Sequence, residues 1–188
     1  MGPIGEVGPV GPVGPIGLTG EVGPVGPIGP IGPVGPSSIV NIADFYGLMG
    51  GGLGQPNDNP TPILPTNSVN FPNPLLNPYG TIQRVLGSTN QFVLPAGGVF
   101  EITFQVGTQN TGELVIVLDG VEQLMSVIGK SGGGFLIGTS IITTPILSTS
   151  IVSINNPAGS DMGGLKIDNA TGNLTQPLSC HLIIKQLQ

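Results

Sequence analysis

Cys180 and His181 are the single cysteine and the single histidine of the chain, and they are neighbours in the sequence. A thiol beside an imidazole is a pair used in nucleophilic catalysis, where the histidine takes the proton of the cysteine. Both residues fall in an apolar run that predicts a β-strand, and adjacent side chains of a strand point to opposite faces. The two groups therefore cannot act together within one subunit, and we interpret Cys180 as a small buried apolar residue.

Two other patterns in the sequence resemble sites that carry chemistry. Gly129-Lys130-Ser131 ends like a phosphate-binding loop, but that motif needs a glycine where this chain has Leu124. Asp161 and Asp168 could share a calcium site in one loop, yet solvated loop carboxylates are the interpretation we favour. We therefore expect no catalytic residues, no cofactor and no metal site, and we do not expect an enzyme.

Composition limits the partners of the chain. It has 188 residues, of which 7% are charged, and its net charge is −6 with only four Lys or Arg. So few basic side chains cannot neutralise a row of phosphates, which excludes nucleic acid as a partner. No apolar stretch reaches the roughly 18 residues of a membrane span.

A strict repeat fills the N-terminal part of the sequence. Residues 2–37 are twelve unbroken Gly-X-Y triplets with proline at nine X positions, and ten of the Y positions are Val or Ile. Only glycine fits where three polyproline-like chains meet at a common axis, so the repeat predicts a collagen-like triple-helical stalk and a homotrimer. The alternative is an unwound Gly/Pro-rich linker. With little ion pairing between chains, the stalk needs a trimeric partner domain to hold it in register.

Residues 38–188 are expected to form that partner domain, a head with an all-β fold. Short runs rich in Val, Ile, Thr and Phe alternate with turn residues, which predicts an antiparallel β-sandwich with almost no helix. Residues 49–78, rich in Gly, Pro and Asn, are interpreted as a long surface excursion. Asp119-Gly120 predicts a two-residue hairpin turn, because both residues tolerate positive φ angles. The expected strands lie within residues 38–48, 81–86, 90–94, 98–108, 112–119, 121–129, 134–144, 149–155, 163–168 and 178–187.

The alternation of apolar residues assigns the faces of the strands. Four residues of one run share a face and should fill the core: Phe100, Ile102, Phe104 and Val106. Leu114–Leu118 is apolar on both faces, as is the last run. A strand covered on both faces implies a second covering surface, for which a neighbouring subunit is the economical candidate.

The last run supplies the candidate trimer-axis strand. We assign to the axis the face opposite Cys180, which carries His181, Ile183 and Leu187. Three copies of His181 near such an axis could bind a metal ion or an anion, or respond to pH. A histidine packed in a subunit interface is the interpretation we adopt.

The order of these features resembles a known group, the bacterial collagen-like surface proteins typified by the Bacillus collagen-like glycoprotein of the spore exosporium. The resemblance is carried by the repeat, the hairpin, the terminal strand ending at Leu187, and the segments 45–46, 98–106, 114–122, 142–144 and 155–159. It implies a jelly-roll head of the tumour necrosis factor and complement type, assembled as a tight trimer around the terminal strand. Threonines in such repeats often carry sugars, and Thr19 is the only threonine of this stalk.

Two functions remain open from the sequence. The first is structural: a trimeric stalk-and-head filament or tip fibre on the extracellular surface of a bacterial spore or cell, held by an anchoring protein of the spore coat, exosporium or appendage. The second is recognition, in which the head binds a glycan or protein receptor, as an adhesin or a phage fibre head does. The chain has no Trp and only two Tyr, so the aromatic platforms of many binding sites are missing. We therefore favour the structural function.

Overall fold

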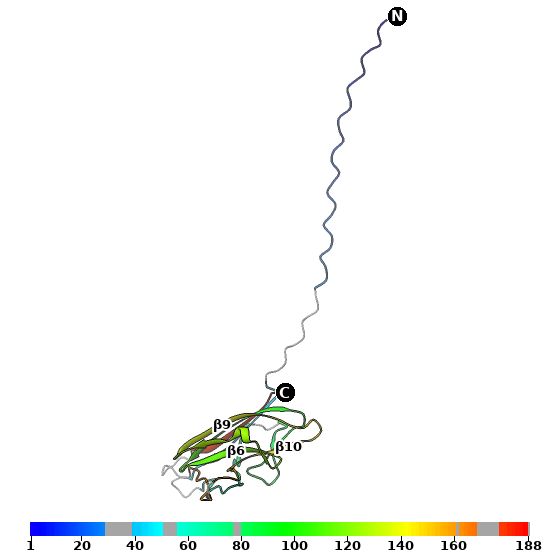
Figure 1. The fold of residues 1–188 in the computed structure, drawn as a ribbon. Coiled ribbons are helices and arrows are strands. Elements are labelled where there is room, and N and C mark those ends of the chain that lie inside the picture. Colours follow the sequence, from blue (N-terminus) through cyan, green and yellow to red (C-terminus); the bar gives the residue numbers. More distant parts are fainter. Residues whose placement is uncertain (29–38, 51–55, 77–79, 161, 169–176, 188) are drawn as a thin grey trace. The chain divides into compact units, whose positions relative to one another are not determined.

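The computed structural model describes residues 1–28, 39–50, 56–76, 80–160, 162–168 and 177–187. The chain divides into two units, Met1–Gly35 and Pro36–Gln188, each of which is drawn in Figure 1 and described by itself. The predicted boundary between stalk and head, at residues 37 and 38, lies outside the described residues.

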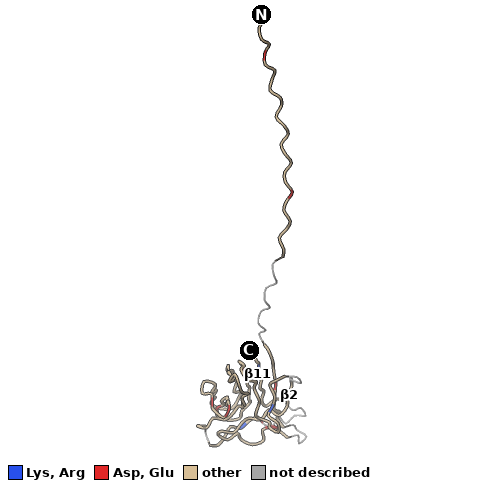
Figure 2. The backbone as a smooth tube through the Cα atoms, turned by 90° about the vertical axis from the view of Figure 1, so that its right-hand side faces the viewer, with Lys and Arg blue, Asp and Glu red and all other residues tan. Residues whose placement is uncertain are grey.

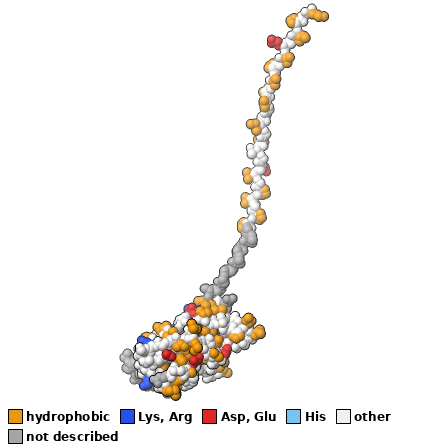
Figure 3. All heavy atoms as spheres, in the orientation of Figure 1, with side chains coloured by type: hydrophobic (Ala, Val, Ile, Leu, Met, Phe, Trp, Pro, Cys, Tyr) orange, Lys and Arg blue, Asp and Glu red, His pale blue; other side chains and the backbone are white. Residues whose placement is uncertain are grey.

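The described part of the first unit, residues 1–28, is an extended chain without helix or strand. Its apolar side chains project into solvent along its length (Figure 3). A Cβ atom added to Gly14, or to any other glycine from Gly2 to Gly26, would meet no atom of this chain within 4 Å. These glycines also have no positive φ angle. For residues 1–28, neither contacts nor backbone conformation within one chain therefore explain a glycine at every third position.

The second unit consists of two antiparallel sheets. The five-stranded sheet has the order β2-β1-β11-β5-β9 and the six-stranded sheet the order β3-β4-β10-β6-β7, with β8 paired to β6. The strands are β1 (Asn41–Leu48), β2 (Asn73–Leu76), β3 (Gln83–Arg84), β4 (Phe92–Leu94), β5 (Val99–Thr108), β6 (Gly112–Leu118), β7 (Val121–Glu122), β8 (Ile128–Lys130), β9 (Gly134–Thr143), β10 (Ser150–Asn155) and β11 (Leu178–Gln186).

The chain crosses several times between the two sheets, although β1 and β2, β3 and β4, and β6 and β7 each stay within one sheet. From β5 onward the chain passes to β6 in the second sheet, returns for β9, crosses again for β10 and ends in β11. This alternation is that of a jelly-roll sandwich, and the predicted all-β sandwich is confirmed. Within the described residues the helical structure is one short 3-10 turn, η1 (Leu124–Ser126), and none of it is long and apolar enough to cross a membrane.

The core lies between the two sheets and follows the predicted alternation. The four residues of β5 assigned to the core, Phe100, Ile102, Phe104 and Val106, are buried. Phe92 of β4 joins the sheets, because its ring centroid lies 4.5 Å from that of Phe45 and 6.3 Å from that of Phe71. Buried aromatic contacts of this kind are among the larger packing contributions in a small domain.

The hairpin prediction is confirmed, whereas the strand predicted after it is broken. Asp119 and Gly120 have φ angles of 50° and 79°, as a two-residue type I′ turn requires. The predicted strand 121–129 is instead β7, η1 and the start of β8. Ser126 causes the interruption: its hydroxyl accepts a hydrogen bond from the amide of Ile116 and donates to the carbonyl of Gln123.

The interpretation of residues 49–78 as a surface excursion is wrong in part. This segment contains β2, and it buries Val69 and Phe71 in the core. Asn59, only 3% exposed, acts like a strand partner: its side-chain amide donates to the carbonyl of Asn70 at 3.0 Å, and its side-chain oxygen accepts from the Asn70 amide at 2.9 Å. An asparagine side chain thus replaces a peptide group in the pairing, which an apolar pattern cannot reveal.

Two further expectations need correction. Residues 163–168 do not form a strand but two isolated bridges, Leu165 with Ile63 and Ile167 with Thr108. In β6, Val115 and Val117 on the outer face are 0% and 7% exposed within the single chain. The chain itself covers both faces of β6, so this strand gives no reason for a neighbouring subunit.

Gly47 offers a test of the packing between β1 and the Asn59–Asn70 pairing. A Cβ atom there would lie 2.6 Å from the Cys180 sulfur and 2.9 Å from the Asn70 carbonyl oxygen. Overpacking of this kind typically costs about 1–3 kcal/mol, so we expect Gly47→Ala to lower the free energy of unfolding by that amount in urea titrations. Gly159→Ala is the control, because that position has open space and no positive φ angle. Equal unfolding midpoints for the two variants would contradict the described packing.

Candidate functional site

Two of the three residues predicted for the trimer axis, His181 and Ile183, lie on β11, the central strand of the five-stranded sheet. His181 and Ile183 are on the outer face and half-buried, opposite the buried Leu182 and Ile184. Leu187 follows the strand, and its amide donates a hydrogen bond to the Val99 carbonyl at 2.7 Å. The predicted division of β11 into two faces is confirmed, although the outer face is only half-buried in one chain.

Exposed apolar side chains extend this surface across the sheet. On the edge strand β9, Ile137 and Ile141 are each 57% exposed, and they pair with Gln105 and Glu101 of β5. Further exposed apolar residues on this face are Ile42 of β1 and Phe135 of β9. We call this face, from β1 across β11 and β5 to β9, the outer sheet surface. A hollow of about 90 Å³ at one end of it is lined in part by Gln105, Phe135 and His181.

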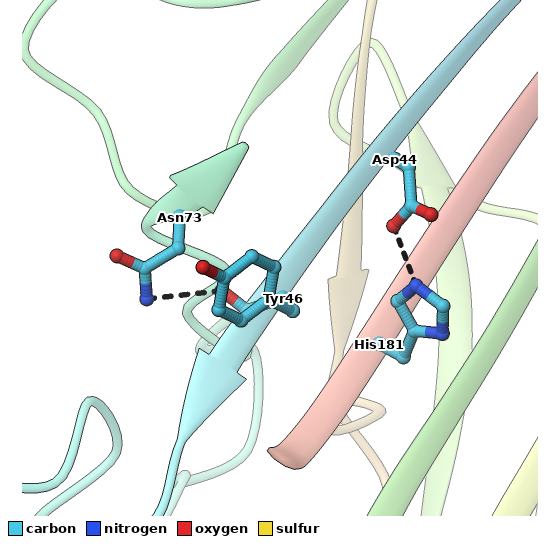
Figure 4. Close-up of polar contacts among 4 residues, drawn as sticks. All are labelled: Asp44, Tyr46, Asn73 and His181. Atoms are coloured by element: carbon cyan, nitrogen blue, oxygen red, sulfur yellow. Dashed lines mark hydrogen bonds and ion pairs between the residues drawn. The ribbon is translucent and has the colours of Figure 1, made fainter. Parts of the chain in front are cut away.

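A histidine–carboxylate hydrogen bond and a lysine–carboxylate ion pair lie between the apolar residues of the outer sheet surface. His181 Nε2 lies 2.5 Å from Asp44 Oδ1, with the imidazole as donor, and Lys185 Nζ lies 2.6 Å from Glu101 Oε1. Figure 4 shows the first pair spanning β1 and β11. Each charged group faces its partner on an adjacent strand. Covering this surface would therefore leave none of these four groups buried without a partner.

Neutral hydrogen bonds continue the same pattern. The hydroxyls of Thr103 and Thr139 lie 3.0 Å apart across β5 and β9. At the opposite edge of the sheet, the side-chain amide of Asn73 donates a hydrogen bond to the carbonyl of Tyr46 at 3.4 Å (Figure 4). This bond connects β2 to β1. The outer sheet surface thus satisfies these polar groups internally and leaves its apolar groups exposed.

Cys180 lies on the opposite, inner side of β11 and is buried. Its thiol donates to the carbonyl of Asn70 at 3.2 Å and accepts from the Asn59 amide at 3.6 Å. Burial raises the pKa of the Cys180 thiol to about 12, so the group stays protonated at neutral pH and is a poor nucleophile. The predictions that Cys180 is a buried apolar residue and that it faces away from His181 are confirmed.

The raised pKa gives stability a defined dependence on alkaline pH. The thiol stays protonated in the folded chain up to about pH 12, whereas an unfolded cysteine ionises from about pH 9. Its contribution to stability is therefore complete below pH 9 and is lost between pH 9 and pH 12, by about 1.4 kcal/mol per pH unit. Urea unfolding at several pH values should show a shallower alkaline loss for Cys180→Ser, which keeps a donor for Asn70. Identical alkaline slopes for the two proteins would refute this.

Within the part of the chain that the structure describes, the other sequence motifs form no reactive site. Gly129 and Lys130 belong to β8, and the residues that follow form β9 rather than a helix. Asp161 lies outside the described residues, so its relation to Asp168 is not defined. Among the described residues, no group of three or more His, Cys, Asp or Glu is placed to hold a metal ion. Thr19 is exposed on the first unit.

Sequence reasoning missed the partners of the axis residues. Asp44 and Glu101 face His181 and Lys185 only because β1 and β5 flank β11 in the sheet. An acidic residue in an otherwise apolar strand, as Asp44 is, was the available signal. Charged residues are sparse along the chain (Figure 2). The pairing of these four residues on one face of one sheet is therefore a distinctive feature of this surface.

Comparisons with known proteins give one kind of match. No family model matches the sequence, and no curated protein matches it. Among solved structures, the chain is similar to the globular domain of the zebrafish complement 1qA protein, with a TM-score of 0.47 and 14% sequence identity. The similarity covers 78% of this chain and 96% of that one.

Proposed function

We propose that this protein is a non-enzymatic, homotrimeric stalk-and-head protein of the extracellular surface, in which a collagen-like triple helix carries a jelly-roll head. The observation that carries the proposal is the glycine at every third position of residues 2–37. The described glycines have room for a side chain within one chain. Two further chains wound around the same axis supply the missing reason, because only glycine fits at the centre of a triple helix.

The outer sheet surface supports the same assembly. A protein surface that exposes several large apolar side chains together commonly marks an interaction site. Here Ile137, Ile141 and Phe135 are exposed while the charged residues beside them are already paired. Another copy of the chain can cover such a surface and exclude water from it without leaving a charged group buried and unpaired. His181, Ile183 and Leu187 are then part of the interface between the three heads.

Three copies around one axis place a specific demand on this surface. A three-fold interface is heterologous, so each copy contributes two different patches that meet in a closed ring. The apolar edge at β9 and the β1–β11 part of the same sheet provide two such patches. In this arrangement the heads hold three N-terminal chains in register, which the weakly charged stalk cannot do through ion pairs of its own.

The proposed location of the protein rests on the composition of the stalk and the head. A stalk with almost exclusively Val and Ile at its Y positions and a weakly charged head suit a filament or tip fibre on a bacterial spore or cell, with an anchoring protein of the spore coat, exosporium or appendage. Sparse glycosylation would then be confined to Thr19. The head acts as the trimerising and displayed part, and no reaction is assigned to it.

Immunogold labelling tests the proposed location. Antibodies raised against the head are applied to intact spores and to intact vegetative cells of the source organism, without permeabilisation. We expect gold particles outside the outermost layer, and loss of labelling in a strain that lacks the gene. Labelling confined to sectioned, opened cells would overturn the surface assignment.

A further inference from the structure

The outer face of the six-stranded sheet carries a hollow of about 440 Å³. Val117 of β6 and Ser153 of β10 lie side by side in the sheet register and line it, together with Ile151 and the carboxylate residue Glu122. Glu122 also fixes one wall, since its Oε1 accepts a hydrogen bond from the Ala158 amide at 2.7 Å. The hollow is in the size range of small-ligand sites.

A second hollow, of about 350 Å³, adjoins the first. Thr66, Ser68 and Gln91 line both, so the segment from Thr66 to Ser68 forms a ridge between them. The lining of the second hollow is almost wholly polar and includes Thr61 and Asn90. The two hollows together form a groove that begins on the outer face of the six-stranded sheet and continues over residues 61–70 and 90–91. We call it the ridge groove.

The ridge is held in a strained conformation. Thr66 has a φ angle of 71°, which is a genuine outlier for a β-branched residue. Its amide donates to the Asn156 carbonyl at 2.8 Å, and its carbonyl accepts from the Asn155 side-chain amide at 2.8 Å. Residues kept in such conformations by their surroundings cluster at ligand-binding sites.

The first hollow offers several hydrogen-bond acceptors. The hydroxyls of Ser68 and Ser153 both donate to Asn155 Oδ1 at 2.8 Å, which leaves their lone pairs to accept bonds from a ligand. Glu122 adds a carboxylate, while the exposed Ile151 offers an apolar surface beside these groups. The residues that line the two hollows, all within the described chain, include no Lys or Arg.

We infer that the ridge groove is a binding site for neutral oligosaccharides. A sugar presents several hydroxyl donors beside an apolar patch of ring C–H groups, which matches acceptors placed around Ile151. A carboxylate without a basic neighbour disfavours anionic ligands such as phosphates or sialylated glycans. Two adjoining hollows separated by a ridge suit two neighbouring sugar units of one chain.

The inference goes beyond the proposed assembly and does not depend on it. The ridge groove lies on the six-stranded sheet, whereas the outer sheet surface belongs to the five-stranded sheet. Three copies would present three equivalent grooves, and multivalency would raise the apparent affinity without any new contact. Light scattering reports the assembly separately, so failure of the groove and failure of the trimer are distinguishable.

Glycan binding by the full chain tests the inference. The protein is applied to a printed array of neutral oligosaccharides built from glucose, galactose, mannose, rhamnose and N-acetylglucosamine, with sialylated and sulfated oligosaccharides beside them. We expect retention of neutral members only, with affinities then measured by NMR titration. Ile151→Trp, which fills the first hollow from a side chain that is 41% exposed, should weaken binding at least tenfold.

A matched control and a second variant complete the experiment. Leu147→Trp adds the same side chain at a position that is 96% exposed and lines neither hollow, so its affinity should equal that of the unaltered protein. Gln91→Ala removes an exposed lining side chain and should also weaken binding, whether or not Ile151→Trp folds normally. No binding of neutral oligosaccharides at millimolar concentration, binding only of anionic ones, or unchanged affinity in Gln91→Ala would overturn the inference.

Discussion

Ile137→Lys is expected to convert the trimer into monomers. Ile137 is 57% exposed in one chain, on an edge strand, so a lysine there has little cost in the isolated head. In the proposed trimer the same position is covered by another copy, and an unpaired buried charge costs about 3–5 kcal/mol. The substitution is present in all three copies, so the total loss of association free energy should be large enough to dissociate the trimer. The measurement is molar mass in solution by light scattering.

Leu147→Lys is the control for this experiment. Leu147 is also an exposed apolar residue, but it lies in the segment between β9 and β10, outside the outer sheet surface. Its replacement should leave the molar mass unchanged. If Ile137→Lys remains as large as the unaltered protein while Leu147→Lys dissociates, the interface has been assigned to the wrong surface.

Gly14→Ala is expected to disrupt the stalk. In a triple helix each such glycine faces two other chains at the axis, and a single replacement disrupts the winding locally. In one extended chain a Cβ atom at Gly14 would contact nothing within 4 Å. The positive circular dichroism band of the triple helix should lose most of its amplitude, and its melting transition should broaden and move to lower temperature.

Val13→Ala separates the two interpretations of the repeat. Val13 is 98% exposed and occupies a Y position, where a triple helix accepts most side chains. We expect its melting to stay close to that of the unaltered protein. If Gly14→Ala and Val13→Ala behave alike, residues 2–37 act as an unwound linker and the repeat no longer supports three chains.

Much of the fold could be predicted because apolar alternation is local information. The buried face of Val99–Val106 and the Asp119-Gly120 turn each depend on a few consecutive residues, and the structure has them as expected. The same holds for the two faces of β11, where Cys180 is buried and His181 is on the outer side. Period and turn chemistry suffice for such features.

The misses share a physical cause, which is dependence on contacts distant in the sequence. Asn59 pairs with the backbone of Asn70, and β2 forms on the edge of β1, so residues 49–78 contribute to the core without any periodic pattern. The outer face of β6 is covered by the chain itself, which its double-sided apolar run could not distinguish from cover by another subunit.

The ridge groove was also beyond sequence reasoning, although a signal for it was present. Thr66 gives no hint of a positive φ angle, because a β-branched residue is the least expected there. The paired asparagines Asn155 and Asn156, which end and follow β10, hold it in place. Two consecutive amide side chains after a buried strand could have suggested a loop that is fixed by side-chain hydrogen bonds.

Light scattering on the unaltered protein in solution tests the central claim most directly. One chain has a mass of 18.9 kDa, and three glycine-periodic segments can wind only if three chains are held together. We predict a molar mass three times that of the chain, stable on dilution to low micromolar concentration. A single species with the mass of one chain, at concentrations where the head remains folded, would contradict the account.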